Sequence, residues 1–464
     1  MIKKVIALLL SAAIAASYTI TAFAAEASVP PSAASDAYVV MDAETGQVLI
    51  EKNMEKKEFP ASITKVLTVA LGLENGKLED SVNVTQDAVF AIEPNSSHIA
   101  LQPDEIVTLK DLVYATMLPS ANDAANVIAE HIGGTMKDFA ELMNKKAEEL
   151  GCADTHFVNA SGLPDDDHYT TAYDMALITK YAIGVPGFMD VFGMQDTYTL
   201  QPTNKQPKQR KFATEHMMLV QSKYYYEGTL GGKLGWTQEA KHTSVTLAEK
   251  NGMKLICVVM KAAQKYDKFT DSIALFDYCF DNFKRMTITK DQLKTFNVSH
   301  YRSGGSAENV NIFGEDEYSF LVHKNMSQGD ISIDYDVPEY FSDENINPTV
   351  MFKTKSKSMY GEIGSYPMSF RTLALDTDID STDAVVPAKT PLRTQLMNVL
   401  KIIGIVLLSI LGLIVLLFLV MLLIRGFNRF RKWRRRQNRM KRIREYDDSD
   451  IITRPPPPTV RRRK

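Results

Sequence analysis

The chain has 464 residues, 45% of them hydrophobic and 23% charged, with a net charge of −3. This composition is that of folded protein, the length predicts two or three domains, and three cysteines are too few for a disulfide scaffold. Charge is unevenly distributed, because residues 425–464 carry 16 Lys and Arg against 4 Asp and Glu. A basic tail of this kind usually binds phosphate groups, either of nucleic acid or of anionic lipid.

The N-terminus, residues 1–24, has the pattern of a secretory signal peptide. Two lysines precede an apolar run (5–14), and Ala22-Phe23-Ala24 offers the small residues that a signal peptidase requires. A membrane anchor is the alternative, but polar residues at 17–19 interrupt the apolar run. We expect cleavage, followed by a Pro/Ser/Ala linker over 25–36.

Residues 37–287 alternate between strand and helix patterns and predict an α+β domain. The expected strands are 38–41, 47–50, 243–247 and 255–259, and the expected helices are 62–73, 109–131, 136–150 and 269–283. Strands at both ends and helices between them predict one antiparallel sheet, with its edge and centre drawn from opposite ends of the domain and helices covering it.

The rest of the chain predicts a membrane-attached C-terminus. Residues 288–375 are rich in β-branched and aromatic residues and predict a small β domain, and 376–400 form a polar linker. A transmembrane helix is expected at 401–424, since the stretch after Lys401 is uncharged and long enough to cross a bilayer. The arginines that follow place the tail 425–464 in the cytoplasm and the preceding domains outside. A nucleic-acid partner is not expected.

Ser62-Ile63-Thr64-Lys65 begins an expected helix after Pro60. A three-residue spacing places both polar side chains on one helix face, so the Lys65 amine can reach the Ser62 hydroxyl and act as its base. Ser-x-x-Lys is a weak signal alone, although Ser62 is the sole serine of this chain with a lysine three residues later.

Two further elements strengthen the case for a serine nucleophile. Ser120-Ala121-Asn122 follows Pro119 at an expected turn, and Lys233-Leu234-Gly235 lies at an expected strand start. Each pattern occurs a second time, as Ser81-Val82-Asn83 and as Lys250-Asn251-Gly252, in polar settings that favour a structural role.

The order of these segments resembles that of the D-alanyl-D-alanine carboxypeptidases, the low-molecular-mass penicillin-binding proteins. The matching segments are Phe59–Thr68, Met117–Ala125, Phe139 with Met143-Asn144, Leu150-Gly151, Thr155–Asn159, Gly162-Leu163 and His168–Ala176. The resemblance covers about residues 36–285. It implies a β-lactamase/transpeptidase-like fold, peptidoglycan stem peptides as substrates, β-lactams as inhibitors and no cofactor.

The resemblance also implies roles for individual residues. Ser62 would be acylated with Lys65 as its base, and Ser120 would relay a proton to the departing D-alanine. Asn122 would hold the substrate amide and Lys233 would place positive charge near Ser120.

The backbone N–H groups of Ser62 and Trp236 would form the oxyanion hole. Leu234 departs from the family pattern, which has a threonine there to bind the substrate's terminal carboxylate. Leucine has no donor, so we expect weaker carboxylate recognition unless Thr237 substitutes. Thr214-Glu215-His216 is a second departure, where the family has Thr-Asn and a basic residue.

Three alternatives are weighed on sequence grounds, of which the scaffold is the strongest. The departures at Leu234 and Glu215 suit a weakened or inactive peptidoglycan-binding scaffold on the same fold. A β-lactamase would need a glutamate to activate water, and no Glu occurs between Glu149 and Glu215. Endopeptidase cleavage of the same peptides is a further possibility within the family. The eight histidines show no ligand spacing, so no metal is expected.

Overall fold

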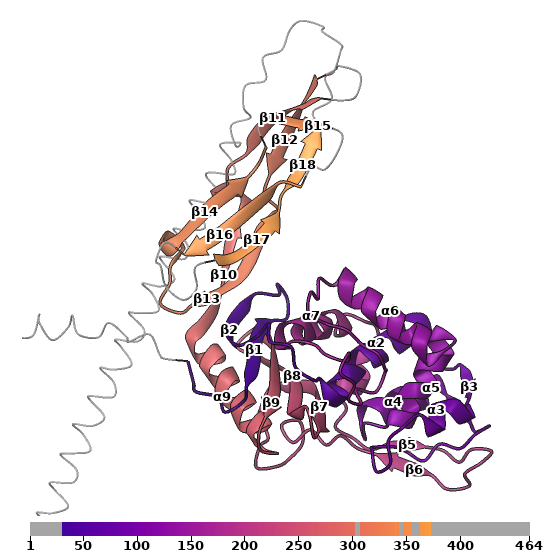
Figure 1. Cartoon of the computed structure of the whole chain (residues 1–464). Helices are drawn as coiled ribbons and strands as arrows, with labels where there is room; N and C mark the ends of the chain where they lie inside the picture. The colour runs from indigo at the N-terminus through magenta and orange to yellow at the C-terminus, as the bar shows by residue number, and fades with distance from the viewer. Residues whose placement is uncertain (1–29, 302–306, 339, 343–346, 355–361, 373–464) are drawn as a thin grey trace, which may run out of the picture. The chain divides into compact units, whose positions relative to one another are not determined.

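A computed structural model describes residues 30–301, 307–338, 340–342, 347–354 and 362–372 (Figure 1). All of them belong to one compact unit that ends at Leu375. The expected signal peptide, the membrane segment 401–424 and the basic tail lie outside the described residues. Within the described part, no helix is both long and apolar enough to cross a membrane.

A five-stranded antiparallel sheet forms the centre of the first domain (Figure 1). Its strands are β1 (Ala37–Asp42), β2 (Val48–Lys52), β7 (Thr229–Thr237), β8 (Lys241–Lys250) and β9 (Met253–Ala262). Their order is β2-β1-β9-β8-β7, so the first two strands of the domain pair with its last. The expected sheet from opposite ends of the domain is confirmed.

The sheet is buried on both faces, which explains why its strands are almost uniformly apolar. Val39 and Val258 point into the core shared with α2 (Lys65–Asn75) and α7 (Ala172–Ala182). Their neighbours Val40 and Val259 point into a second core, shared with α9 (Asp267–Asn282). Alternation of side chains along each strand thus makes three layers: helices, sheet, helix.

The remaining helices cover the first core. They are α3 (Gln86–Phe90), α4 (Leu109–Met117), α5 (Asn122–Gly133), α6 (Met136–Glu149) and α8 (Phe188–Phe192). Three of the longer helices begin with Thr-x-x-Asp, and the hydroxyls of Thr108, Thr135 and Thr171 each accept a hydrogen bond from the aspartate's backbone N–H. These caps satisfy N–H groups that the helix itself leaves unpaired.

The predicted helix 109–131 is wrong as one element, because the structure breaks it into α4 and α5, and the turn expected at Ser120 is confirmed. Pro119 lacks the amide hydrogen that would continue the helix after Leu118, and Ser120 adopts a left-handed φ of +63°. Apolar periodicity continues across the break, which is why it predicts one helix. The break matters because it turns Ser120 out of the helix.

Short strand pairs complete the first domain. They are β3 (Ser81–Asn83) with β4 (Ile106–Thr108) and β5 (Tyr198–Leu200) with β6 (Arg210–Phe212). The repeated patterns are structural, as expected: Ser81-Val82-Asn83 is β3 itself, and Asn251 and Gly252 form the left-handed turn between β8 and β9.

Strands follow α9 in a small β region with a core of its own. They are β10 (Phe283–Thr289), β11 (Phe296–Tyr301), β12 (Ala307–Phe313), β13 (Glu317–His323), β14 (Ile331–Asp336), β15 (Tyr340–Ser342), β16 (Thr349–Thr354), β17 (Glu362–Pro367) and β18 (Ser369–Thr372). β10 pairs with β13, and buried Phe320 and Phe352 lie at the centre of this core. A β-rich segment after the helical domain was expected from composition.

Candidate active site

Ser62 lies in a single 3-10 turn, Ala61–Thr64, which leads directly into α2 at Lys65. The expected helix therefore starts three residues later than Ser62, but the turn still brings the two side chains together. Lys65 Nζ lies 2.9 Å from Ser62 Oγ. Ala61, just before the serine, has a left-handed φ of +51°, so the nucleophile follows a sharp turn of the chain.

Lys65 is fully buried, and its environment suits a neutral amine. Burial, and to a smaller extent the charge of Lys233, hold the pKa of Lys65 well below its usual value. Its Nζ also lies 2.6 Å from Asn122 Oδ1 and 2.5 Å from the Ser161 carbonyl oxygen. A neutral amine has two N–H donors for these oxygens and one lone pair for the Ser62 hydroxyl hydrogen. Lys65 can therefore act as a base.

Ser120 and Asn122 reach the same place from the break between α4 and α5. The Ser120 Oγ is buried and has no hydrogen-bond partner among the described residues. Such an unpaired buried hydroxyl is costly in a native protein unless a ligand completes it. Asn122 is the first residue of α5, which explains how one short turn delivers both side chains.

Strand β7 forms the opposite wall, and Gly235 allows it to come close to the nucleophile. A Cβ at Gly235 would lie 2.9 Å from the Ser62 backbone nitrogen and would also clash with the Thr243 hydroxyl. The close approach puts the strand next to the N–H of Ser62. Trp236, the next residue, is 61% exposed at the rim.

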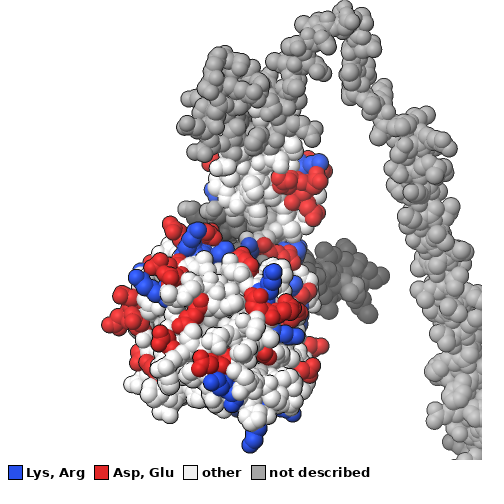
Figure 2. Space-filling model, turned by 90° about the vertical axis from the view of Figure 1, so that its right-hand side faces the viewer, with Lys and Arg blue, Asp and Glu red and all other residues white. Residues whose placement is uncertain are grey.

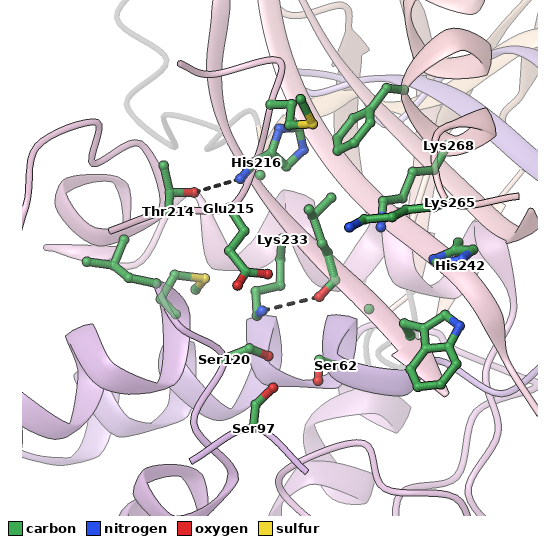
Figure 3. Close-up of a pocket in the computed structure, with 18 residues that line it drawn as sticks. Ser62, Ser97, Ser120, Thr214, Glu215, His216, Lys233, His242, Lys265 and Lys268 are labelled. Atoms are coloured by element: carbon green, nitrogen blue, oxygen red, sulfur yellow. Dashed lines mark hydrogen bonds between the residues drawn. The ribbon is translucent and has the colours of Figure 1, made fainter. Parts of the chain in front are cut away.

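Ser62, Ser120 and Lys233 line one cavity of about 590 Å³ (Figure 3). The side chains come from three segments far apart in the chain and point toward one another. The sequence-predicted residues Ser62, Lys65, Ser120, Asn122, Lys233 and Trp236 are thus brought together. This convergence is the condition on which a serine-nucleophile mechanism depends.

Thr237 lies in a different part of the site from Leu234. It lines a second cavity of about 400 Å³, which also reaches Ser62, and its hydroxyl accepts a hydrogen bond from the Ala240 N–H. Leu234 lines the first cavity only. Thr237 therefore lies outside the cavity that Leu234 lines, and its part in binding the substrate carboxylate stays a prediction.

Sequence reasoning missed a cationic pair in the first cavity, Lys265 and Lys268, which lie before and at the start of α9 (Figure 3). Lys268 is 5% exposed, and burial, then the nearby Lys265 charge, lowers its pKa to about 8. Nothing in the local pattern marks these lysines, because only the fold of α9 against the sheet carries them to the cavity.

Lys233 and Glu215 complete the charges of this cavity. Burial lowers the pKa of Lys233 to about 7, the carboxylate of Glu215 opposes this shift, and Lys268 adds to it. In Figure 3 the Glu215 carboxylate extends toward Lys233. Three lysines against one glutamate make the cavity suited to an anionic group.

His168 has a structural role, which its contacts explain. Its Nδ1 accepts from the Val158 N–H at 3.2 Å, so the Nε2–H donates to the Thr64 hydroxyl at 3.0 Å. Burial lowers the pKa of His168 to about 3, which keeps it neutral. It braces the turn that carries Ser62 and takes no direct part in the chemistry.

The three cysteines, too few for a disulfide scaffold, are free and buried. Burial raises the pKa of Cys152 and of Cys257 to about 12, so neither thiol ionises near neutral pH. Burial likewise raises the pKa of Cys279.

Comparisons with known proteins agree with this site. Residues 24–264 match the D-alanyl-D-alanine carboxypeptidase family, peptidase S11. The chain is 29% identical over 296 residues to the D-alanyl-D-alanine carboxypeptidase DacF of Bacillus subtilis, covering 63% of this chain and 74% of that protein. It is 32% identical over 279 residues to DacC of Escherichia coli, covering 58% and 67%.

Solved structures show the same fold. Penicillin-binding protein 5 of Haemophilus influenzae superposes with a TM-score of 0.59 at 24% identity, covering 75% of this chain and 98% of that one. A D-alanyl-D-alanine carboxypeptidase of Mycobacterium tuberculosis superposes with a TM-score of 0.50 at 27% identity, covering 55% and 94%. With the serine, the lysine and the cavity already in place, the chain belongs to the D-alanyl-D-alanine carboxypeptidase family of serine peptidases.

Proposed function

We propose that this protein removes the terminal D-alanine from peptidoglycan stem peptides through an acyl-enzyme on Ser62, and that penicillins acylate the same oxygen. One observation carries the proposal: a fully buried Lys65 amine, 2.9 Å from the Ser62 hydroxyl, in a cavity that Ser120 and Lys233 also line. A weak nucleophile becomes reactive when a neighbouring base takes its proton.

In the first step the Lys65 amine takes the hydroxyl proton while Ser62 Oγ bonds to the carbonyl carbon of the penultimate D-alanine. The carbonyl oxygen becomes an oxyanion, which the backbone N–H groups of Ser62 and Trp236 would stabilise. Each such preorganised donor typically lowers the barrier by about 3 kcal/mol. Gly235 matters here because it lets β7 approach Ser62.

In the second step the C–N bond breaks and the leaving amine needs a proton. The unpaired Ser120 hydroxyl would pass the proton from the Lys65 ammonium to the leaving amine. Lys233 would hold positive charge beside the Ser120 hydroxyl. Water then attacks the ester carbonyl, again with Lys65 as base, and Ser62 leaves with its proton restored. Acylation and deacylation thus use the same groups.

The terminal carboxylate of the substrate would be held by the cations of the first cavity. Leu234 offers no hydrogen bond, but Lys268 and Lys265 lie in the same cavity. We therefore propose that charge attraction to these lysines replaces the missing hydroxyl. This arrangement favours an active enzyme over the scaffold alternative, which Leu234 had kept open.

We also propose that the enzyme works outside the cell, tethered by the segment 401–424, with the basic tail in the cytoplasm. The apolar run, the arginines after it and the secretory pattern at the N-terminus support this. On the face shown in Figure 2 both charge signs are interspersed on the described residues, unlike the basic face of a nucleic-acid-binding protein. Protease added to intact cells should digest the peptidase domain and spare a tag placed after Lys464.

A fluorescent penicillin tests the nucleophile. We expect the full-length protein to be labelled, Ser62→Ala to lose labelling and Ser81→Ala, in the repeated pattern on β3, to keep it. D-alanine release from a pentapeptide should likewise be lost in Ser62→Ala and kept in Ser81→Ala. A folded wild-type protein that neither labels nor releases D-alanine would instead be the scaffold, and rapid penicillin hydrolysis without peptide turnover would indicate a β-lactamase.

A further inference from the structure

Asp123 is a buried carboxylate beside the active site that has no step of its own in the proton transfers. It is 1% exposed and directly follows Asn122 in the first turn of α5. The helix dipole favours an aspartate at such a position, and one Asp123 oxygen accepts from the Ala124 N–H of α5 at 2.9 Å. Its other hydrogen bonds go to a different segment of the chain, so the start of a helix does not by itself account for this residue.

That segment is residues 97–101, here called the strap. The backbone nitrogen of Ile99 lies 3.2 Å from each Asp123 oxygen, and that of Leu101 lies 3.0 Å from one of them. Ala100, between the two donors, has a left-handed φ of +55°. A residue with a Cβ keeps such a backbone only where its surroundings hold it there. The Asp123 carboxylate therefore fixes a strained turn of the strap.

The strap lies on the turn that carries the active-site side chains. The Ser97 carbonyl oxygen accepts a hydrogen bond from the Asn122 N–H at 2.8 Å, and Asn122 Oδ1 lies 2.6 Å from Lys65 Nζ. Ser97 also lines both cavities and lies beside Ser120 in Figure 3. The strap thus connects the Asp123 carboxylate to the base and to the hydroxyl that relays its proton.

The hairpin of β5 and β6 holds the strap from its other side. Arg210 Nη1 donates to the Ile99 carbonyl oxygen at 3.1 Å, and Gln206 Nε2 donates to that of Ala100 at 2.6 Å. The N–H groups of the strap therefore go to Asp123 and its carbonyl groups to the hairpin. Because Gln206 is partly exposed, the strap can be loosened from this side without a change to the buried carboxylate.

Asp123 also acts on Lys65 through its charge. Burial is the main cause that lowers the pKa of Lys65, Lys233 adds to the lowering and Asp123 opposes it. His168, which also interacts with Lys65, is neutral because burial lowers its pKa to about 3. Acylation requires the neutral amine, so its rate rises with pH through the pKa of Lys65. Removal of the Asp123 charge should lower that pKa and move the rising limb of the pH profile to lower pH.

We propose that Asp123 is a positioning residue for acylation, which holds the strap on the turn of Ser120 and Asn122 and sets its negative charge against the base Lys65. The proposal rests on the acyl-enzyme function of Ser62. Asp123→Asn replaces one acceptor oxygen by an NH2 group that faces the N–H donors of the strap. A misplacement of about 1 Å can cost about 100-fold in rate, so we expect acylation to slow by about tenfold or more.

The acylation rate of the full-length protein in detergent, measured with a penicillin from pH 5 to pH 9, tests both parts. Asp123→Asn should slow acylation and move the rising limb to lower pH. Asp111→Asn is the matched control, because Asp111 likewise lies in the first turn of a helix and caps α4. It should keep the wild-type rate and limb. Gln206→Ala should slow acylation by about threefold, the weight of one hydrogen bond, and leave the limb in place.

These results together would support the positioning role. An Asp123→Asn variant that acylates at the wild-type rate, or whose limb does not move, would overturn it, and so would an equal loss in Asp111→Asn. If Asp123→Asn does not fold, Gln206→Ala decides: a slower rate supports the strap and a wild-type rate overturns it. All of these outcomes leave the acyl-enzyme standing, whereas absence of acylation in the wild type would refute both.

Discussion

Leu234 stands where the family has a threonine, and its place in the cavity shows which interaction with the substrate is lost. The side chain is partly buried and lines the wall beside Lys233 and Lys268, where a hydroxyl could meet the substrate carboxylate. A hydrogen bond to a charged group is worth about 1.5–3 kcal/mol.

Leu234→Thr should therefore raise kcat/KM for D-alanine release about tenfold or more. The pentapeptide assay measures it, and Glu141→Gln, an exposed change on α6, is the control. An unchanged or lower rate in the threonine variant would contradict this account of Leu234.

The charge of Lys233 predicts a pH dependence. Since burial lowers the pKa of Lys233 to about 7, the amine loses its charge as pH rises through neutrality, and kcat/KM for an anionic substrate should fall above about pH 7. The Glu215 carboxylate opposes that shift, so Glu215→Gln should lower the pKa further and move the falling limb to lower pH. If the falling limb of the Glu215→Gln pH profile stays in place or moves to higher pH, Glu215 does not raise the pKa of Lys233.

At the scale of single elements, β7 is the strand whose backbone serves the site directly. Gly235→Ala places a Cβ 2.9 Å from the Ser62 nitrogen and must push the strand away from the nucleophile. We expect acylation by penicillin to slow by about 100-fold or more, the effect of losing an oxyanion donor. Gly329→Ala, with 3.5 Å to its nearest neighbour, should acylate normally. Equal rates in the two variants would argue against Trp236 as an oxyanion donor.

The paired helices α4 and α5 show where periodicity succeeds and fails. Both helices lay their apolar faces on the same core, so the pattern predicts helix throughout. The turn between them is set by Pro119 and by the left-handed Ser120, a local effect that a hydrophobic pattern does not record.

At the scale of the whole molecule, two buried histidines predict sensitivity to acid. Burial lowers the pKa values of His168 and His216 to about 3, whereas both titrate near 6.5 in the unfolded chain. Between these values the unfolded state binds protons that the folded state does not, so stability falls as pH falls below 6.5. Each histidine lowers the free energy of unfolding by up to about 1.4 kcal/mol for each unit by which the pH falls.

Denaturant unfolding between pH 7.5 and pH 5 measures this loss, above the range in which most carboxylates titrate. The free energy of unfolding should decline steadily over that range. His216→Gln, which keeps a hydrogen-bonding group toward Thr246, should make the decline less steep if it folds. A wild-type stability that stays constant down to pH 5 would contradict the neutral state of both histidines.

The sequence by itself determined whatever depends on near neighbours: strand alternation, threonine caps and the three-residue spacing that joins Ser62 to Lys65. It also carried the ordered segments that place the chain in its family. Only the tertiary structure decided that Lys268 lies in the first cavity with Ser62, and that Glu93 and Glu239 line a second cavity with Thr237. Such meetings depend on how α9 and β7 pack against the helical layer, and packing of a whole core leaves no signature at the residues it brings together.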